Sequence, residues 1–230
     1  MSNWYPDNKD ELKKVIKSYL TSTQKYTVNG LVVPHAGYIY SGKIAGKAYS
    51  FLQNKKFKHA IVFGPSHYTG FYGTCTLESI KTPFGDVKIP KTDLRKLKYE
   101  HSIDNQIPFL QYLHINNILP IVVGDITHDN AKNIVKQYNK KDTLFIFSTD
   151  LSHFLQYNIA KKKDKETIKI IETLDLKKFP NIDACGKNAL KILFALCKQN
   201  KWQPKLIEYK NSGDITKDKL SVVGYASFRF

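Results

Sequence analysis

Apolar residues recur every three to four positions in some segments of the chain and form short continuous runs in others. The helical spacing predicts helices over residues 9–20, 43–52, 106–113, 131–138, 158–174 and 183–198. The short runs predict strands over residues 30–33, 59–63, 118–123, 143–147, 205–209 and 222–228, and the segments 74–77 and 86–89 indicate a hairpin. Strands that alternate with helices predict an α/β fold in which helices cover both faces of a sheet.

The links between these elements are short. Proline and glycine predict a loop over residues 34–42, directly after the first strand. The chain has no internal repeat, low-complexity tract or Gly/Ser-rich linker that would divide it, and 230 residues with 42% hydrophobic content suffice for one substantial core. We therefore expect a single domain over residues 1–230.

The chain carries a formal net charge of +16, which could attract nucleic acid or an anionic membrane surface. All of its 36 Lys and Arg residues are lysines except Arg95 and Arg229. Proteins that read bases favour arginine, whose planar guanidinium matches guanine in a bidentate way. The lysines therefore indicate a solvated surface with no nucleic-acid partner, and phosphopeptide binding would lack its usual clustered arginines.

The N-terminus, residues 1–7, has neither the basic start nor the apolar stretch of a signal peptide, and no later apolar run reaches membrane-spanning length. The cysteines, Cys75, Cys185 and Cys197, form no C-x-x-C pair. We expect a cytoplasmic protein with reduced thiols and without a membrane partner.

Three histidines share one position relative to the predicted strands. His35, His67 and His153 each lie just beyond the C-terminal end of a strand. Open α/β sheets bind ligands outside these ends, so the three imidazoles can converge although they are far apart in sequence. This shared position predicts a metal site. The histidines at positions 59, 114 and 128 lack it and are interpreted as structural.

Cys185 is predicted to lie in the first turn of a helix that Asp183 caps. The partial positive charge at a helix N-terminus should lower the pKa of this thiol and favour the thiolate, which is the form that binds metals. Cys75 and Cys197 have no such setting, and Cys197 lies on the apolar stripe of the same helix. Cys185 is therefore the thiol that we expect to take part in chemistry.

Asp150 and His153 are three residues apart at a strand end, and one turn of helix would place both on the same face. The carboxylate could then orient the imidazole as a general base, or the pair could supply a further metal ligand. The alternative for Asp150 is a structural role as the cap of the next helix. A hydrolase built on Cys185 with this pair would leave His35 and His67 without a role, so metal binding is favoured.

Several longer motifs, in a fixed order along the chain, carry a resemblance to a known family. They are Pro34-His-Ala-Gly-Tyr-Ile-Tyr-Ser-Gly42, Gly64-Pro-Ser-His67, Glu100-His-Ser-Ile-Asp104, Ser148-Thr-Asp-Leu-Ser-His-Phe154, Asp183-Ala-Cys-Gly186, Asn211-Ser-Gly-Asp214 and Val222-Val-Gly-Tyr-Ala226. With these motifs the chain resembles the MEMO family, which is related to the class III extradiol dioxygenases of the LigB type. The resemblance covers nearly the whole chain, and Asp104 departs from it because the family has glutamate there.

The resemblance implies a three-layer α/β/α fold with a central mixed sheet, as in LigB and MEMO proteins, and a cleft at one edge of the sheet. The metal ligands that it implies are His35, His67 and Cys185. It places Asp150 and His153 in the same cleft as catalytic residues, with His153 in the position of the base of the dioxygenases, and it places His101 at the border of the cleft.

The resemblance also implies a metal. Two histidines and a carboxylate hold iron(II) in the dioxygenases, so iron(II) is expected first. Because a thiolate replaces the carboxylate here, copper and zinc also suit the site.

Two functions follow from these expectations. The first is a metal-dependent oxidoreductase with a dioxygenase-like site. The alternative is a non-enzymatic adaptor that uses the same cleft, as the animal relatives are described. In either case a small molecule or a peptide would occupy the cleft. Bacterial relatives are named AmmeMemoRadiSam system protein B, which implies a radical SAM protein and an AMMECR-type protein as partners.

Overall fold

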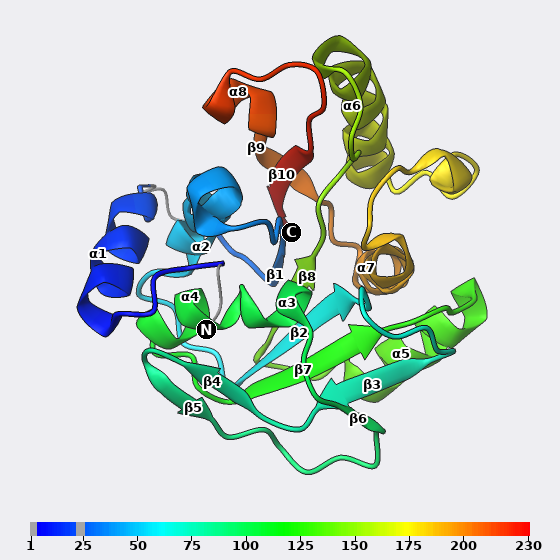
Figure 1. Cartoon of the computed structure of the whole chain (residues 1–230). Coiled ribbons are helices and arrows are strands. Elements are labelled where there is room, and N and C mark those ends of the chain that lie inside the picture. The colour runs from blue at the N-terminus through cyan, green and yellow to red at the C-terminus, as the bar shows by residue number, and fades with distance from the viewer. Residues whose placement is uncertain (1–3, 22–25) are drawn as a thin grey trace.

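The computed structural model describes residues 4–21 and 26–230. Residues 1–3, part of the N-terminus considered above for a signal peptide, lie outside the described residues. An eight-stranded sheet forms the centre of the molecule, and helices lie on both of its faces (Figure 1). This is the three-layer α/β/α fold with a mixed sheet that is predicted above.

The strands follow the order β6-β3-β7-β2-β8-β1-β10-β9 across the sheet. Their bounds are β1 (Gly30–Val33), β2 (His59–Pro65), β3 (Thr74–Leu77), β6 (Lys96–Leu97), β7 (Ile118–Val123), β8 (Thr143–Ser148), β9 (Lys205–Asn211) and β10 (Gly224–Arg229). The central strands β7, β2, β8 and β1 are parallel, whereas β3, β10 and β9 pair antiparallel with a neighbour. Parallel strands that are covered on both faces consist of nearly continuous apolar residues, which is why the sequence reveals them.

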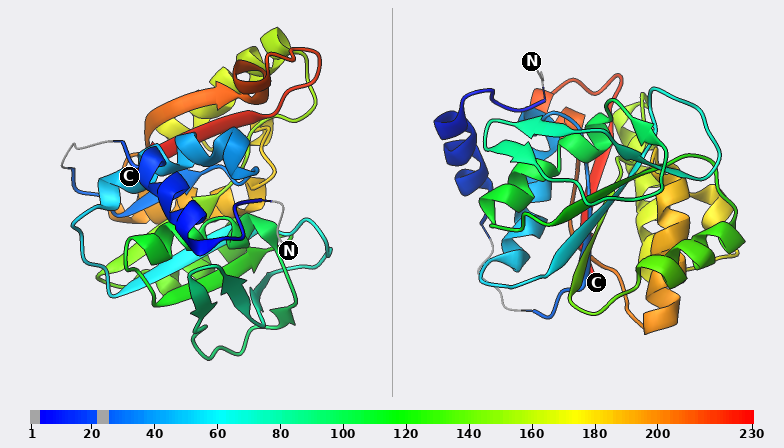
Figure 2. Two further views of the ribbon diagram at one scale, coloured as in Figure 1. Left: turned by 60° about the vertical axis from the view of Figure 1, so that its left-hand side comes forward. Right: turned by 90° about the horizontal axis from the view of Figure 1, so that it is seen from below.

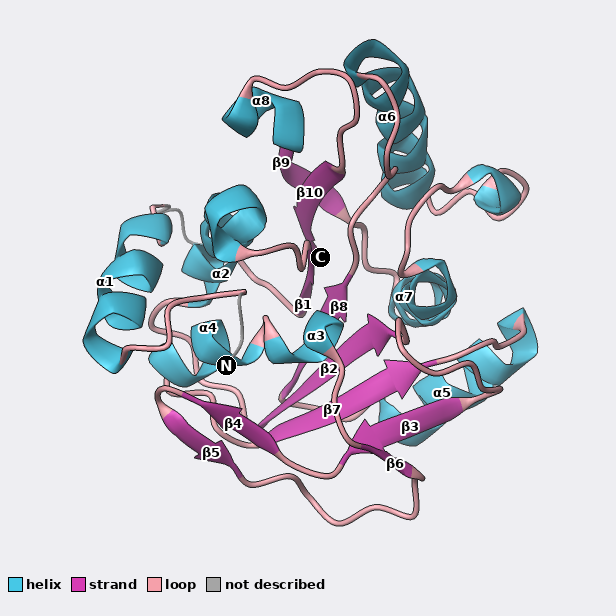
Figure 3. Cartoon of the chain, viewed as in Figure 1, coloured by secondary structure: helices cyan, strands magenta, loops and turns pink. Residues whose placement is uncertain are grey.

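Helices cover both faces of this sheet, as Figure 3 shows. Their bounds are α1 (Lys9–Tyr19), α2 (Lys43–Tyr49), α3 (His101–Asp104), α4 (Ile107–Tyr112), α5 (His128–Tyr138), α6 (Tyr157–Thr173), α7 (Lys187–Asn200) and α8 (Ser212–Thr216), with the shorter turns η1 (Tyr38–Gly42), η2 (Ser50–Leu52) and η3 (Phe179–Asn181). Among the described residues, no helix combines the length and the apolar character that crossing a bilayer requires.

Two apolar clusters fill the space between the sheet and the helices, one on each face. Leu31 and Val33 of β1 belong to the first cluster and Val32 to the second, because successive side chains of a strand point to opposite faces. The first cluster includes side chains of α1, α2 and α4, and the second includes side chains of α5, α6 and α7. The two views of Figure 2 show these helical layers on either side of the strands.

Two local predictions are wrong. β3 is not half of a hairpin with residues 86–89, because it pairs with β7 and β6 in the main sheet. The hairpin instead joins β4 (Ile80–Thr82) to β5 (Gly85–Val87). The segment 34–42 is not all loop, since its second half forms the π-helical turn η1, which continues directly into α2. Neither strand partners nor a π-helical turn leave a clear signal in local sequence spacing.

Candidate metal centre

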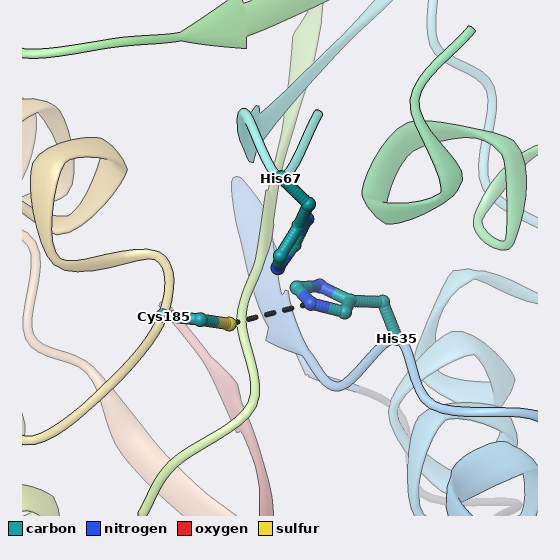
Figure 4. Close-up of side chains that lie close together, drawn as sticks. All are labelled: His35, His67 and Cys185. Atoms are coloured by element: carbon teal, nitrogen blue, oxygen red, sulfur yellow. Dashed lines mark hydrogen bonds between the residues drawn. The ribbon is translucent and has the colours of Figure 1, made fainter. Parts of the chain in front are cut away.

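Three side chains of metal-ligand type meet at the carboxyl ends of the central strands. His35 follows β1, His67 follows β2, and Cys185 lies just before α7. Their ligand atoms all lie within 4.8 Å of one another. Figure 4 shows that the two imidazoles and the thiol point toward the same space although they come from three separate segments. The structure thus brings together the three residues that the family resemblance implies as metal ligands. His153, the third histidine predicted to converge here because it also follows a strand, does not belong to this group.

The protonation of the buried His35 ring is determined by its neighbours. Its Nδ1 lies 2.9 Å from the Ser148 hydroxyl, which donates its proton to the carbonyl oxygen of Ser102 at 2.6 Å. Because Ser148 has no second proton to give, Nδ1 of His35 must be the donor. The lone pair of Nε2 then faces Sγ of Cys185 at 3.3 Å. Burial and then the neighbouring histidines hold the pKa of His35 well below its usual value, so the ring is neutral, as a metal ligand must be.

A carboxylate fixes the tautomer of His67, as Ser148 does for His35. Oε1 of Glu100 lies 2.9 Å from Nδ1 of His67, and Oε2 accepts the backbone N–H of His67 at 2.7 Å. Oε1 also accepts the backbone N–H of Ser102 at 3.0 Å, as the N-cap of α3. An ionised carboxylate can only accept, so Nδ1 of His67 carries the proton and its Nε2 is free to bind a metal.

Glu100 is a site residue that the sequence reasoning missed. Its side chain is buried, and burial by itself raises the pKa of a carboxyl group. The hydrogen bonds from His101, His67 and Ser102 outweigh burial and hold the pKa of Glu100 well below its usual range. The available signal was its position directly before His101 in a family motif, since ligating histidines commonly donate their second N–H to a carboxylate.

The prediction for the setting of Cys185 is wrong. α7 begins at Lys187 with Gly186 as its N-cap, so Cys185 lies before the helix and Asp183 does not cap it. Gly186 packs so closely on Thr149 that an added Cβ would lie 2.6 Å from the Thr149 Cβ atom. Burial and then the Asp150 carboxyl group raise the pKa of the Cys185 thiol to about 12. The metal-free protein therefore holds a thiol, and a bound cation would displace its proton.

Asp150 and His153 do not share a helical face, because residues 149–153 form no helix. Asp150 is buried, and its Oδ1 accepts the backbone N–H of His35 at 2.8 Å. It does not cap the following helix, α6, whose N-cap is Gln156. Burial raises the pKa of Asp150 to about 6. His153 is half-buried and lies near enough for its charge to lower the pKa of both Asp150 and His35.

His101 borders the cluster, as the resemblance implies. Its ring centroid lies 4.3 Å from that of His67 and 5.4 Å from that of His35. The indole ring of Trp4 stacks on the His101 ring, with the two ring centroids 4.5 Å apart. His67, Glu100 and His101 also form a group of ligand-type side chains, but the Glu100 oxygens already accept several N–H groups. We therefore interpret Glu100 and His101 as residues that hold the His67 ring in place, and not as ligands of a second metal ion.

Asp104, at the end of α3, is a buried carboxyl group whose effect on the stability of the fold can be tested. Its carboxylate accepts the Tyr5 hydroxyl at 3.0 Å, and burial raises its pKa to about 6. A carboxyl group whose pKa is raised in the folded state takes up its proton earlier than in the unfolded chain, so it stabilises the fold as the pH falls. Relative to Asp104→Asn, the wild type should gain up to about 3 kcal/mol of unfolding free energy between about pH 7 and pH 4.

Urea unfolding of the two proteins over this pH range measures the difference. The asparagine of the variant keeps the shape of the side chain but does not titrate. A difference between the two proteins that stays constant with pH would contradict the raised pKa of Asp104.

The fold and the site together define a class: an α/β/α protein in which two imidazoles and a thiol, the ligand types that transition metals prefer, meet at the carboxyl ends of the parallel strands. The chain belongs to the Memo-like family, because the family described as "Memo-like protein" matches residues 2–229. This match confirms the resemblance found in the sequence motifs.

Relatives of this family are similar to the chain over most of their length. A MEMO1 family protein of Thermoplasma acidophilum is 34% identical, over 97% of this chain and 94% of its own. The MEMO1 family protein of Sulfurisphaera tokodaii is 32% identical over 99% of this chain and 96% of its own. That of Sulfolobus acidocaldarius is 36% identical over 86% of this chain and 81% of its own.

Proposed function

We propose that this protein is a redox-active metal protein that binds one transition metal ion through Nε2 of His35, Nε2 of His67 and Sγ of Cys185. The observation that carries the proposal is the fixed protonation of both rings. Ser148 and Glu100 each accept a hydrogen bond from Nδ1, so both Nε2 lone pairs are directed to the space that the thiol also faces. A purely structural cluster would not need two imidazole lone pairs and a thiol to converge on one space.

Iron(II) is the metal that we propose first. Two imidazoles and one anionic ligand on one side of a metal leave positions open, which is the arrangement of non-haem iron oxygenases. The thiolate makes the site softer than a carboxylate would, so copper is the second choice and zinc the third. When bound, iron or copper would supply a one-electron redox centre that could bind oxygen or an organic ligand, whereas zinc has no redox chemistry and would act only as a Lewis acid.

The residues around the ligands would handle protons. Asp150, with its pKa raised to about 6, and the half-buried His153 both lie beside the cluster. An imidazole or a carboxyl group in this position can accept a proton from a bound substrate or donate one to it. We assign this task to His153 because its ring is partly exposed, whereas the Asp150 carboxylate is committed to the backbone N–H of His35.

A groove of about 450 Å³ next to the cluster supports the proposal that an organic ligand binds there. It begins at Ala36 and Gly37, which follow His35, and Trp4, which stacks on His101, forms part of its wall. Its lining also includes the exposed Ile39. A groove of this size and mixed polarity suits a small molecule or a short peptide. The same groove favours the second candidate function, a binding module that holds a metal and a ligand without turnover.

The decisive experiment loads the full chain, purified anaerobically without an affinity tag, with iron(II), copper(I) or zinc(II) in turn. We expect one metal ion per chain by elemental analysis, and oxygen uptake with a catechol after iron(II) loading. Metal without uptake would favour the binding module. Failure to bind any of the three metals would refute the proposal.

A variant of His153 separates binding from turnover. His153→Asn should retain the metal and lower the rate of oxygen uptake by about 100-fold or more, which is the usual contribution of a general base. The matched control is His114→Asn at an exposed position, which should alter neither quantity.

A further inference from the structure

A second pocket lies between α5 and α7, on the helical layer that covers the second apolar cluster. Its volume is about 450 Å³, within the range of small-molecule sites. α5 and α7 pack against each other and are seen side by side in Figure 1. The lining residues are His128, Lys132, Leu176, Lys191, Phe194, Ala195, Lys198 and Gln199. None of them belongs to the candidate metal centre.

The floor of this pocket is apolar and rigid. Phe194 is buried in the second cluster, and its ring packs edge-on against Phe179 with centroids 4.9 Å apart. His128 packs against the same Phe179 ring at 5.0 Å. Leu176, by contrast, is 45% exposed at the pocket. A ligand with an apolar body could cover this leucine and rest on a preformed floor, so binding would cost little side-chain ordering.

The rim of the pocket is cationic. Lys132, Lys191 and Lys198 all line it, and no acidic residue is among the lining residues, all of which lie in the described part of the chain. Nζ of Lys191 is held in place by the carbonyl oxygen of Ile126 at 2.7 Å and by Oδ1 of Asn188 at 2.8 Å.

Two carboxylates lie near the rim, Asp125 beside Lys191 and Asp129 beside Lys132, but neither lines the pocket. Lys132 pairs with Asp129 at 2.9 Å, but both side chains are largely exposed, so water screens this pair. Burial, followed by the charges of Lys191 and Lys132, lowers the pKa of His128. Three ammonium groups around an apolar floor are complementary to a molecule with one anionic end and one apolar end.

We propose that the pocket between α5 and α7 binds a carboxylic acid with a medium-length apolar chain, its carboxylate among Lys132, Lys191 and Lys198 and its chain on Leu176, Ala195 and Phe194. The apolar floor argues against inorganic phosphate, because phosphate would leave it in water. The lysine rim argues against a neutral or cationic amphiphile, because neither would bring a negative charge to the three ammonium groups. This inference is independent of metal binding and goes beyond the proposed function.

The test is calorimetric titration of the full chain with octanoate, with inorganic phosphate and octyltrimethylammonium as comparison ligands. We expect saturable binding of octanoate at one site and at least about tenfold weaker binding of the other two. Equal binding of phosphate would show a site for anions alone and would overturn the proposal, as would the absence of saturable octanoate binding.

Two variants place the binding in this pocket. Lys198→Glu should weaken octanoate binding by about tenfold, because a like charge replaces an attracting one. Ala195→Phe should fill the floor and abolish binding. The matched control is Lys136→Glu, the same change of charge at an exposed position of α5 that does not line the pocket. If octanoate binds both variants as it binds the wild type, the pocket is not the site.

Discussion

Replacing Cys185 by alanine is expected to lower the affinity for a transition metal ion by more than about 100-fold. Loss of a residue that only hydrogen-bonds to a ligand costs about 10–100-fold, and loss of the ligand itself should cost more. The thiol is the one group of the cluster that would contribute a negative charge directly to the cation. With alanine, the two Nε2 atoms of His35 and His67 remain, and two neutral ligands hold a metal weakly. The measurement is a competition titration against a chelator of known affinity.

The same substitution should leave the fold of the metal-free protein nearly intact. Sγ of Cys185 accepts the backbone N–H of Asp150 at 3.2 Å, and loss of this bond should cost about 1 kcal/mol, or about 2–4 °C in Tm. Cys75→Ala is the matched control, because Cys75 is a buried thiol in β3 outside the cluster. Equal metal affinity of Cys185→Ala and wild type would exclude Cys185 as a ligand.

Glu100→Gln should weaken both the metal site and the fold. The amide keeps the size of the side chain but has one acceptor oxygen, where the carboxylate accepts two N–H groups of His67 and one of Ser102. At least one of these donors would lose its partner, at a cost of about 2–4 kcal/mol in unfolding free energy. Metal affinity should fall by about 10–100-fold, because the His67 ring loses the group that orients it.

The dependence of this effect on pH can be predicted from the lowered pKa of Glu100. A carboxylate with a depressed pKa in the folded state stabilises the fold above its ordinary pKa, and this contribution is lost as the pH falls. The difference in unfolding free energy between wild type and Glu100→Gln should therefore be full at pH 7 and shrink below about pH 4. Urea unfolding at neutral and acidic pH measures it.

A surface variant controls for the loss of one negative charge. Glu78 is exposed, so Glu78→Gln makes the same chemical change where water solvates the side chain. It should change neither metal affinity nor stability by more than about 0.5 kcal/mol. If Glu100→Gln behaves like Glu78→Gln, Glu100 does not orient His67.

Much of the fold can be read from the sequence because the relevant signals are local. The apolar runs of β1, β2, β7 and β8 mark strands that are buried on both faces, and the helical spacing over residues 158–174 marks α6 almost to the residue. The approach of His35 to His67 was also predictable. Both residues follow parallel strands of one sheet, and the carboxyl ends of such strands lie at the same edge.

Other features depended on partners that are distant in the chain. The hairpin prediction failed at β3 because its hydrogen-bonding partner, β7, begins more than forty residues later. The start of α7 was misplaced because Gly186 must fit against Thr149, a contact that no helix-capping pattern contains.

The sequence by itself determined most of the order of the strands and helices along the chain and the family, since periodicity and motif order are properties of neighbouring residues. Strand positions predicted that His35 and His67 approach each other, and the family resemblance added Cys185. Only the tertiary structure decided how those groups are protonated. Glu100 and Ser148 set the tautomers of His67 and His35, and burial beside Asp150 raises the pKa of Cys185, where helix capping had suggested the opposite. Desolvation and hydrogen bonding act across space, and so the electrostatic state of a buried site depends on the segments that surround it.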